Sequence, residues 1–286
     1  MPAARAHLFI DTQHGLCNRL RAMASAAVIA RGTGRQLVVV WRPDHHCQAR
    51  LADLLDYPGP VIEDDSADSF RARATKVYNY MEIEPGSAHG AAVLEGKDTG
   101  GDVYIRSAYS LTTRLTSMAQ EQVFLRRLVP SQPVWDLVQT VRHPSDVAAH
   151  IRMATGPAFD HLSHESPENW PAERHRELIE WRMKSDVSRF VDRLTRAFDQ
   201  GARHAFVAAD LAATYAALSE RFGHKLRFLP RESYDRSPRQ LQYAMADLML
   251  LTSAPLLLAS HWSSFSDVAQ RLSRPFHRVE RSGIDF

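Results

Sequence analysis

The stretch Asp146-Val-Ala-Ala-His-Ile-Arg152 decides the interpretation of this chain. Small apolar residues lead into a histidine and an arginine one residue apart, and the helix-unfriendly run Met-Ala-Thr-Gly-Pro follows. This pattern predicts a buried strand that opens into a polar loop. Because side chains alternate along a strand, we expect His150 and Arg152 on one side, at the edge where an open α/β sheet holds its ligand. Arginine suits a phosphate there, since its planar fork makes two parallel hydrogen bonds; pairing with a nearby carboxylate is the simpler alternative.

Strands alternate with helices on both sides of this stretch. After it we expect strands over 205–209, 226–229 and 255–260, and helices over 172–200, 211–222, 239–251 and 264–272. Before it we expect strands over 7–11, 36–41, 77–80, 92–94 and 103–105, and helices over 18–30, 124–128 and 134–142. This alternation predicts an α/β protein with parallel sheets covered on both faces.

Prolines and a change in polarity just before residue 146 indicate a domain boundary. We expect one Rossmann-like domain over residues 1–143 and a second over residues 144–286. A length of 286 residues with 44% hydrophobic residues is sufficient for two compact cores.

Composition excludes several classes of function. The net charge is only +2 and no block of basic residues occurs, so nucleic acid is not an expected partner. No run approaches the ~20 apolar residues of a membrane span, and the N-terminus is too short and polar for a signal peptide. We therefore expect a cytoplasmic enzyme or binding protein. Cys17 and Cys47 match no zinc or CxxC spacing, which favours two free thiols.

Two further loops follow predicted strands in the second half. Asp210 follows the strand 205–209, where its carboxylate can accept hydrogen bonds from a guanine edge or ribose, or can cap the next helix. Ser260-His-Trp-Ser-Ser-Phe-Ser266 opens a predicted helix. Hydroxyls and backbone N–H groups at a helix start favour phosphate binding.

These motifs resemble those of the GDP-fucose-using fucosyltransferases, the superfamily that includes the bacterial nodulation, α1,6 core and protein O-fucosyltransferases. The shared features are His-x-Arg after a strand, an aspartate at a strand end, and Ser-Ser-x-Ser opening a later helix. The N-terminal Gly15-Leu-Cys-Asn-Arg-Leu-Arg21 resembles the opening loop of that family. The resemblance implies a GT-B fold, in which two Rossmann-like domains face each other across a cleft and the C-terminal one holds the nucleotide.

The resemblance also implies roles for individual residues. Arg152 would bind the β-phosphate of a GDP-sugar and stabilise the leaving diphosphate, His150 would support the phosphate or ribose, and Asp210 would take the guanine. The diphosphate would be lined by Ser263, Ser264, Phe265 and Ser266. The N-terminal loop would contribute His14, Gly15, Asn18 and either Arg19 or Arg21. The family works without a metal or other cofactor, which fits the absence of an Asp-x-Asp motif.

The sequence departs from the family beside the first arginine. The family commonly has a second arginine next and an acidic residue two further on, where this chain has Met153 and Thr155. Asp160 takes the place of a carboxylate found in the core α1,6 enzymes, and we expect it to be the base for the acceptor hydroxyl. Lesser candidates for the base are His14, Glu165 and Asp11.

The resemblance implies an inverting, metal-independent bacterial glycosyltransferase that moves fucose or a related sugar from a GDP-sugar to a glycan, glycolipid or small-molecule hydroxyl. Two alternatives stay open. One is a transferase that uses another nucleotide donor, such as a kinase or sulfotransferase, although Gly32-Thr-Gly34 lacks the spacing of a P-loop. The other is a non-catalytic GT-B-like protein that binds nucleotide or glycan, which the missing second arginine favours.

Overall fold

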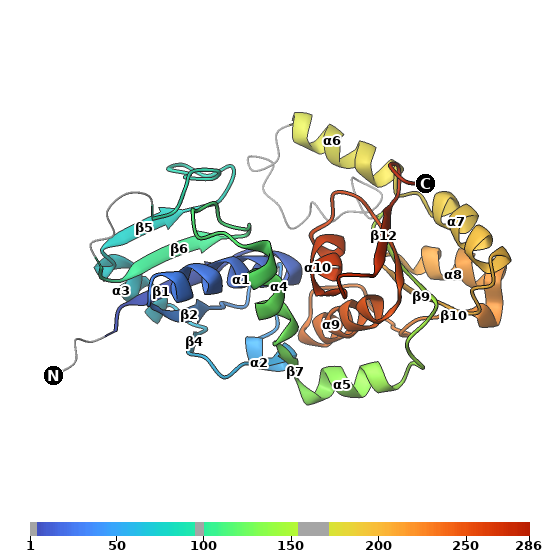
Figure 1. The fold of residues 1–286 in the computed structure, drawn as a ribbon, viewed down its shortest axis with the longest axis horizontal. Helices are drawn as coiled ribbons and strands as arrows, with labels where there is room; N and C mark the ends of the chain where they lie inside the picture. Colours follow the sequence, from blue (N-terminus) through green and yellow to red (C-terminus); the bar gives the residue numbers. More distant parts are fainter. Residues whose placement is uncertain (1–4, 95–99, 154–171) are drawn as a thin grey trace. The chain divides into compact units, whose positions relative to one another are not determined.

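The computed structural model describes residues 5–94, 100–153 and 172–286 (Figure 1). The chain divides into two compact units, one of residues 1–131 with 236–238 and the other of residues 132–235 with 239–286. The sequence-based boundary at 143/144 differs from this division by one helix, α5 (Gln132–Gln139), which lies in the second unit. The predicted domain limits therefore remain a prediction.

The first unit contains a parallel sheet in the order β4-β2-β1-β6-β5. Its strands are β1 (His7–Thr12), β2 (Gln36–Val40), β4 (Val61–Ile62), β5 (Lys76–Asn79) and β6 (Val103–Ser107). A short antiparallel pair joins β3 (Leu55–Asp56) to β7 (Val129–Pro130). The helices are α1 (Leu16–Gly32), α2 (Leu51–Leu54), α3 (Ser66–Arg73) and α4 (Met118–Arg126). The predicted β1–α1–β2 unit is confirmed, and α1 buries Leu20, Met23 and Ala24 completely.

The second unit contains a parallel sheet in the order β10-β9-β8-β11-β12. Its strands are β8 (Val147–Ile151), β9 (Ala205–Ala209), β10 (Leu226–Arg227), β11 (Leu256–Ala259) and β12 (Arg278–Arg281). Besides α5, its helices are α6 (Ala172–Met183), α7 (Val187–Asp199), α8 (Ala212–Phe222), α9 (Pro238–Ser253) and α10 (Ser264–Leu272), with a short turn at η3 (Gly223–Lys225). Every residue of β8 and β9 is buried, as their continuous apolar runs predict for doubly covered strands.

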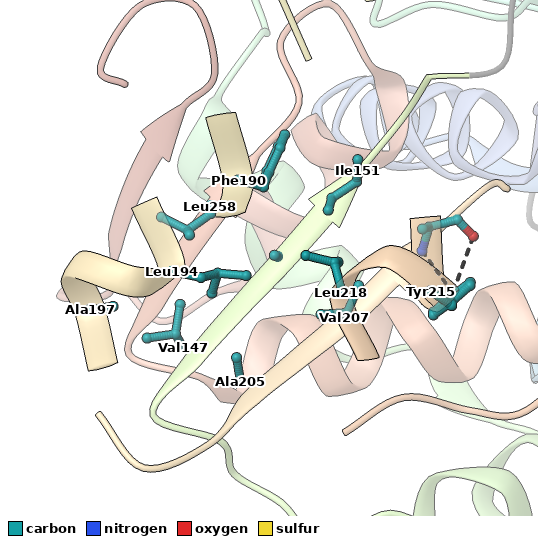
Figure 2. Close-up of a cluster of buried hydrophobic side chains, with 12 residues drawn as sticks. Val147, Ile151, Phe190, Leu194, Ala197, Ala205, Val207, Tyr215, Leu218 and Leu258 are labelled. Carbon is teal, nitrogen blue, oxygen red and sulfur yellow. Dashed lines mark hydrogen bonds between the residues drawn. The ribbon is translucent and has the colours of Figure 1, made fainter. Parts of the chain in front are cut away.

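Alternation along β8 assigns its side chains to two layers. Val147, Ala149 and Ile151 belong to one apolar cluster with side chains of α7 and α8, among them Phe190 and Leu218 (Figure 2). Burying a side chain the size of Phe190 stabilises the fold by about 1.5–3 kcal/mol. Ala148 and His150 consequently face the opposite layer, where His150 meets α10.

The structure differs from the sequence-based expectation in several places, which include the unexpected short elements α2, α3, β3, β4 and β7. The single helix expected over 172–200 is two helices, because Asp186 ends the turn after α6 and its carboxylate accepts the backbone N–H of Ser188 to cap α7. The strand expected over 92–94 is reduced to one bridge, between Ala92 and Thr112. The strand β12 was not expected, since Arg278-Val-Glu-Arg281 has few apolar residues for a strand.

Candidate functional site

The carboxyl ends of β8, β9 and β11 meet at the centre of the second sheet. The chain leaves β8 toward β9 on one side and later returns to β11 on the other side. Such a reversal of strand order separates the following loops and leaves a ligand-binding position between them. Arg152, Asp210 and Ser260 each directly follow one of these three strands.

Arg152 and Asp210 form an ion pair across two strand ends. Nη1 of Arg152 lies 2.6 Å from Oδ2 of Asp210, and both side chains are largely buried, at 21% and 14% exposed. Oδ1 of Asp210 accepts the backbone N–H of Met153 at 3.0 Å. The alternative that Asp210 caps α8 is wrong, because the helix begins after Leu211 and has no side-chain cap. Asp210 instead orients the residues that follow β8.

Tyr215 fixes the strand end that carries Asp210. Its hydroxyl accepts the backbone N–H of Ala209 at 2.7 Å and donates to the carbonyl of the same residue at 3.2 Å (Figure 2). Burial raises the pKa of the Tyr215 phenol, so this hydroxyl remains a donor. Tyr215 of α8 therefore fixes the position of Ala209, the last residue of β9.

Ser260 joins the ends of β8 and β11. Its hydroxyl donates to the carbonyl of His150 at 3.0 Å and accepts the backbone N–H of Arg152 at 2.9 Å. The Ser260 backbone N–H also donates to the His150 carbonyl. Ser260 thus fixes the main chain on both sides of Ile151, which restricts the position of the Arg152 backbone from which the side chain extends.

His150 lies under the start of α10 and is 5% exposed. Its Nδ1 lies 2.8 Å from the hydroxyl of Ser266, and its ring stacks on Phe265 at 4.6 Å between centroids. Burial lowers the pKa of His150 to about 3. The ring is therefore neutral at neutral pH, and its contact with Ser266 holds the start of α10 in place.

The start of α10 carries two of the predicted serines at a helix terminus without a side-chain cap. Ser263 is the N-cap residue, and its side chain makes no capping hydrogen bond. Ser263 and Ser264 are half-buried, whereas Ser266 is buried against His150. The predicted serines therefore have two roles. Ser266 supports the helix through His150, and Ser263 and Ser264 lie at the N-terminal end of α10.

Arg182 is a buried side chain of this site that the sequence did not indicate. It lies in α6, is 8% exposed, and its Nε and Nη1 atoms have no hydrogen-bond partner among the described residues. Burial lowers the pKa of Arg182 to about 9, with further effects of opposite sign from Arg152 and Asp210. The guanidinium therefore lies within electrostatic reach of the ion pair and stays charged at neutral pH.

The predicted site residues of the first unit include two arginines that donate hydrogen bonds to other residues of the same unit. Arg19 is fully buried and donates to the His14 carbonyl, the Arg42 carbonyl and the Asp44 carboxylate. Of the two arginines weighed as alternatives, only Arg21 is partly exposed, and its Nε donates to the Ala108 carbonyl. Gly15 caps α1, and Asn18 is half-buried in its first turn.

Two of the four candidates for the catalytic base, Asp11 and His14, lie among the described residues. Asp11 is 1% exposed and accepts hydrogen bonds from Gln13, Arg42 and Tyr104, so its carboxylate serves the structure of the first unit. His14 is half-buried, and its ring lies 5.0 Å from that of His46. Asp160 and Glu165, with Thr155 of the sequence departure, lie outside the described residues.

The described part of the chain contains neither a cluster of metal-binding side chains nor a membrane-spanning helix. In residues 5–94, 100–153 and 172–286, no group of three His, Cys, Asp or Glu side chains is arranged to hold a metal ion. None of the helices in those ranges is both long and apolar enough to cross a membrane. Both cysteines, Cys17 and Cys47, are buried and free, as expected.

Comparison with known proteins supports the fold. No family model matches the sequence, and no curated protein sequence matches it either. Among solved structures, NodZ α-1,6-fucosyltransferase soaked with GDP-fucose matches with a TM-score of 0.62 and 16% identity over 94% of this chain and 93% of that chain.

Two further structures give similar values. Fucosyltransferase NodZ from Bradyrhizobium matches with a TM-score of 0.60 and 14% identity over 94% of each chain. POFUT1 in complex with GDP-fucose matches with a TM-score of 0.58 and 11% identity over 99% of this chain and 100% of that chain. The expected fold class is therefore confirmed: this chain has the α/β, GT-B-type fold of these fucosyltransferases.

Proposed function

We propose that this protein is a glycosyltransferase that takes fucose or a related sugar from a GDP-sugar. The donor would bind at the carboxyl ends of β8, β9 and β11. The observation that carries the proposal is Arg152, a cation held by Asp210 and Ser260 at the reversal point of the sheet. Proteins of the same fold were solved with GDP or GDP-fucose, which supports this donor class.

Arg152 would act on the leaving group. Breaking the bond between the sugar and the diphosphate places negative charge on the diphosphate, and a guanidinium beside it stabilises that charge. Backbone N–H groups at the start of α10, beside Ser263 and Ser264, would add further donors. This chemistry requires no metal ion, so we propose that transfer is metal-independent.

Asp210 has a structural task in addition to the proposed contact with guanine. Its carboxylate already accepts from Arg152 and Met153. A carboxylate has about four acceptor positions, so holding Arg152 and Met153 is compatible with a contact to a base or ribose donor. Phe265, which stacks on His150, and Ser266 would contribute to the same donor site from α10.

We propose that transfer inverts the configuration at the sugar carbon, with a hydroxyl of a glycan, glycolipid or small molecule as the acceptor. Inversion in one step needs a base within hydrogen-bond reach of that hydroxyl. We propose Asp160 as this base, with His14 and Glu165 as alternatives; the burial of Asp11 makes that carboxylate a weaker candidate.

The test is calorimetry of the purified chain with GDP, UDP and ADP, followed by a hydrolysis screen over GDP-sugars. We expect GDP to bind at least about tenfold more tightly than UDP or ADP, since one base-specific pair is worth about 1.4 kcal/mol or more. Equal binding of the three nucleotides would remove the support for a GDP-sugar donor. Tight GDP binding without turnover of any GDP-sugar would favour a non-catalytic nucleotide-binding protein.

A further inference from the structure

Arg182 has an unusual environment for an arginine. The side chain is 8% exposed, yet two of its three nitrogen atoms lack a hydrogen-bond partner among the described residues. Buried arginines in the same unit are paired: Arg193 contacts both carboxylate oxygens of Glu280, and Arg231 lies 2.6 Å from Asp247. An unpaired buried guanidinium is costly to the fold, so its retention calls for a partner.

The packing of α6 explains why this side chain remains buried. Trp181, the preceding residue, stacks on His261 at 4.0 Å between ring centroids, which attaches α6 to the loop between β11 and α10. Trp181 also contacts Lys184, whose Nζ atom lies 4.1 Å from the centroid of the Trp181 ring. Just beyond the helix, Ser185 and Ser282 exchange a buried hydrogen bond of 2.9 Å. The end of α6 is thereby fixed beside the proposed donor site.

The charges of the site do not balance. Among the described residues, Arg152 and Arg182 are both cationic, His150 is neutral, and the Asp210 carboxylate interacts with both arginines. One positive charge is left over among these residues, and the N-terminus of α10 adds the positive end of a helix dipole. An anion is the chemical class that compensates both.

We propose that Arg182 and Arg152 together bind the diphosphate of the nucleotide-sugar donor, with Arg182 supplying from α6 the second positive charge that Met153 does not supply. The inference rests on the proposed function and extends it. It assigns a donor-binding role to a residue 30 positions away from Arg152 in the sequence. It also predicts a preference for nucleoside diphosphates over monophosphates, because two separate guanidiniums match two phosphoryl groups better than one.

The test compares Arg182→Met with a matched control, Arg193→Met. Methionine keeps the unbranched apolar part of the side chain and removes the charge. Arg193 is equally buried in the neighbouring helix α7 but donates two hydrogen bonds to the Glu280 carboxylate. Calorimetry with GDP and GMP, and thermal melting without nucleotide, would be measured for wild type and both variants.

We expect Arg182→Met to weaken GDP binding by about 10- to 100-fold, the usual effect of losing charge-assisted hydrogen bonds, and to weaken GMP binding less than threefold. Without nucleotide it should melt at or above the wild-type temperature, because an unpaired buried charge is removed. Arg193→Met should melt lower and keep wild-type GDP affinity. A purely structural Arg182 would give the opposite result, a lower melting temperature with unchanged GDP affinity, and would overturn the inference.

The two proposals fail in different ways. If wild type prefers GDP over UDP and ADP but Arg182→Met binds GDP as wild type does, the inference is wrong and the proposed function stands. If wild type shows no preference for GDP, the proposed function is wrong, and inorganic pyrophosphate then tests the anion site alone. Loss of pyrophosphate binding in Arg182→Met would support the inference in that case; unchanged or absent pyrophosphate binding would overturn it.

Discussion

Arg152 and Asp210 are 58 residues apart in sequence, and their charged groups meet at 2.6 Å where β8 and β9 end. The pair resolves the two alternatives that the sequence leaves open for Arg152, since carboxylate pairing and ligand binding are compatible. A carboxylate that holds one side of a guanidinium leaves its other donors directed elsewhere. The ion pair therefore orients Arg152 and at the same time reduces the net charge that an incoming phosphate encounters.

Replacing Asp210 should separate orientation from binding. In Asp210→Asn we expect kcat to fall by about 10- to 100-fold, because a misplaced catalytic group costs rate steeply. KM for the GDP-sugar should rise and the preference for GDP over ADP should fall, because an amide offers the guanine one acceptor oxygen where the carboxylate offers two. Steady-state kinetics with GDP-fucose measure both values. An unchanged KM with an unchanged preference for GDP over ADP would show instead that Asp210 orients Arg152 and does not contact the guanine.

Removing the Arg152 side chain should lower kcat more than replacing Asp210, the residue that orients it. In Arg152→Ala, kcat should fall by about 100- to 1000-fold, the usual loss when one donor to a developing oxyanion is removed. Arg152→Lys keeps the charge but loses the planar fork, and we expect it to recover only part of the rate. Circular dichroism provides the control that both variants remain folded. Full activity in Arg152→Ala would exclude the proposed donor site.

The acid sensitivity of the second unit should depend on His150. Its folded-state pKa is lowered to about 3 from 6.5, so between these pH values the unfolded chain binds a proton that the folded chain does not. Stability therefore falls as the pH drops below 6.5, by about 1.4 kcal/mol for each pH unit, until His150 protonates in the folded state near pH 3.

His150→Asn should remove this contribution while keeping a polar group opposite Ser266. Urea unfolding at pH 7 and pH 5 would measure the effect as a difference between wild type and variant, which cancels the contributions of other histidines. We expect the wild type to lose about 2 kcal/mol more than the variant over this interval. Equal losses would mean that His150 is accessible to protons in the folded protein.

The elements around the site could be predicted from the sequence because each carries a local signal. The apolar run 147–151 and the serine-rich start of α10 define their own structure, and both are found where expected. The break between α6 and α7 was missed, since Lys184-Ser-Asp186 contains neither glycine nor proline. Arg182 was also missed, because an arginine on a helix is ordinarily a solvent-exposed residue, and only tertiary packing makes this one buried.

The Arg19–Asp44 pair should be structural. Arg19 is fully buried and reaches Asp44 at 2.7 Å, and the other Asp44 oxygen accepts the backbone N–H groups of His46 and Cys47. Asp44→Ala removes the carboxylate partner of a buried cation, and we expect a loss of about 3 kcal/mol in the free energy of unfolding. Asp68→Ala, which removes an acid that is 59% exposed, is the control and should cost less than about 1 kcal/mol. Urea unfolding measures both, and equal costs would contradict the role of Asp44.

Met153 should not tolerate the arginine that the fucosyltransferase pattern places beside the first one. Its side chain packs against the apolar cluster of β8, β9, α7 and α8, and its sulfur lies 4.0 Å from the Thr214 hydroxyl. Met153→Arg would place a charge at the edge of that cluster, which we expect to lower the free energy of unfolding by about 1–3 kcal/mol. Because the position faces the core, the new arginine should not restore GDP affinity to Arg182→Met. Calorimetry on the double variant decides this: recovery of wild-type affinity would mean that position 153 reaches the diphosphate, and that Arg182 is replaceable from β8 itself.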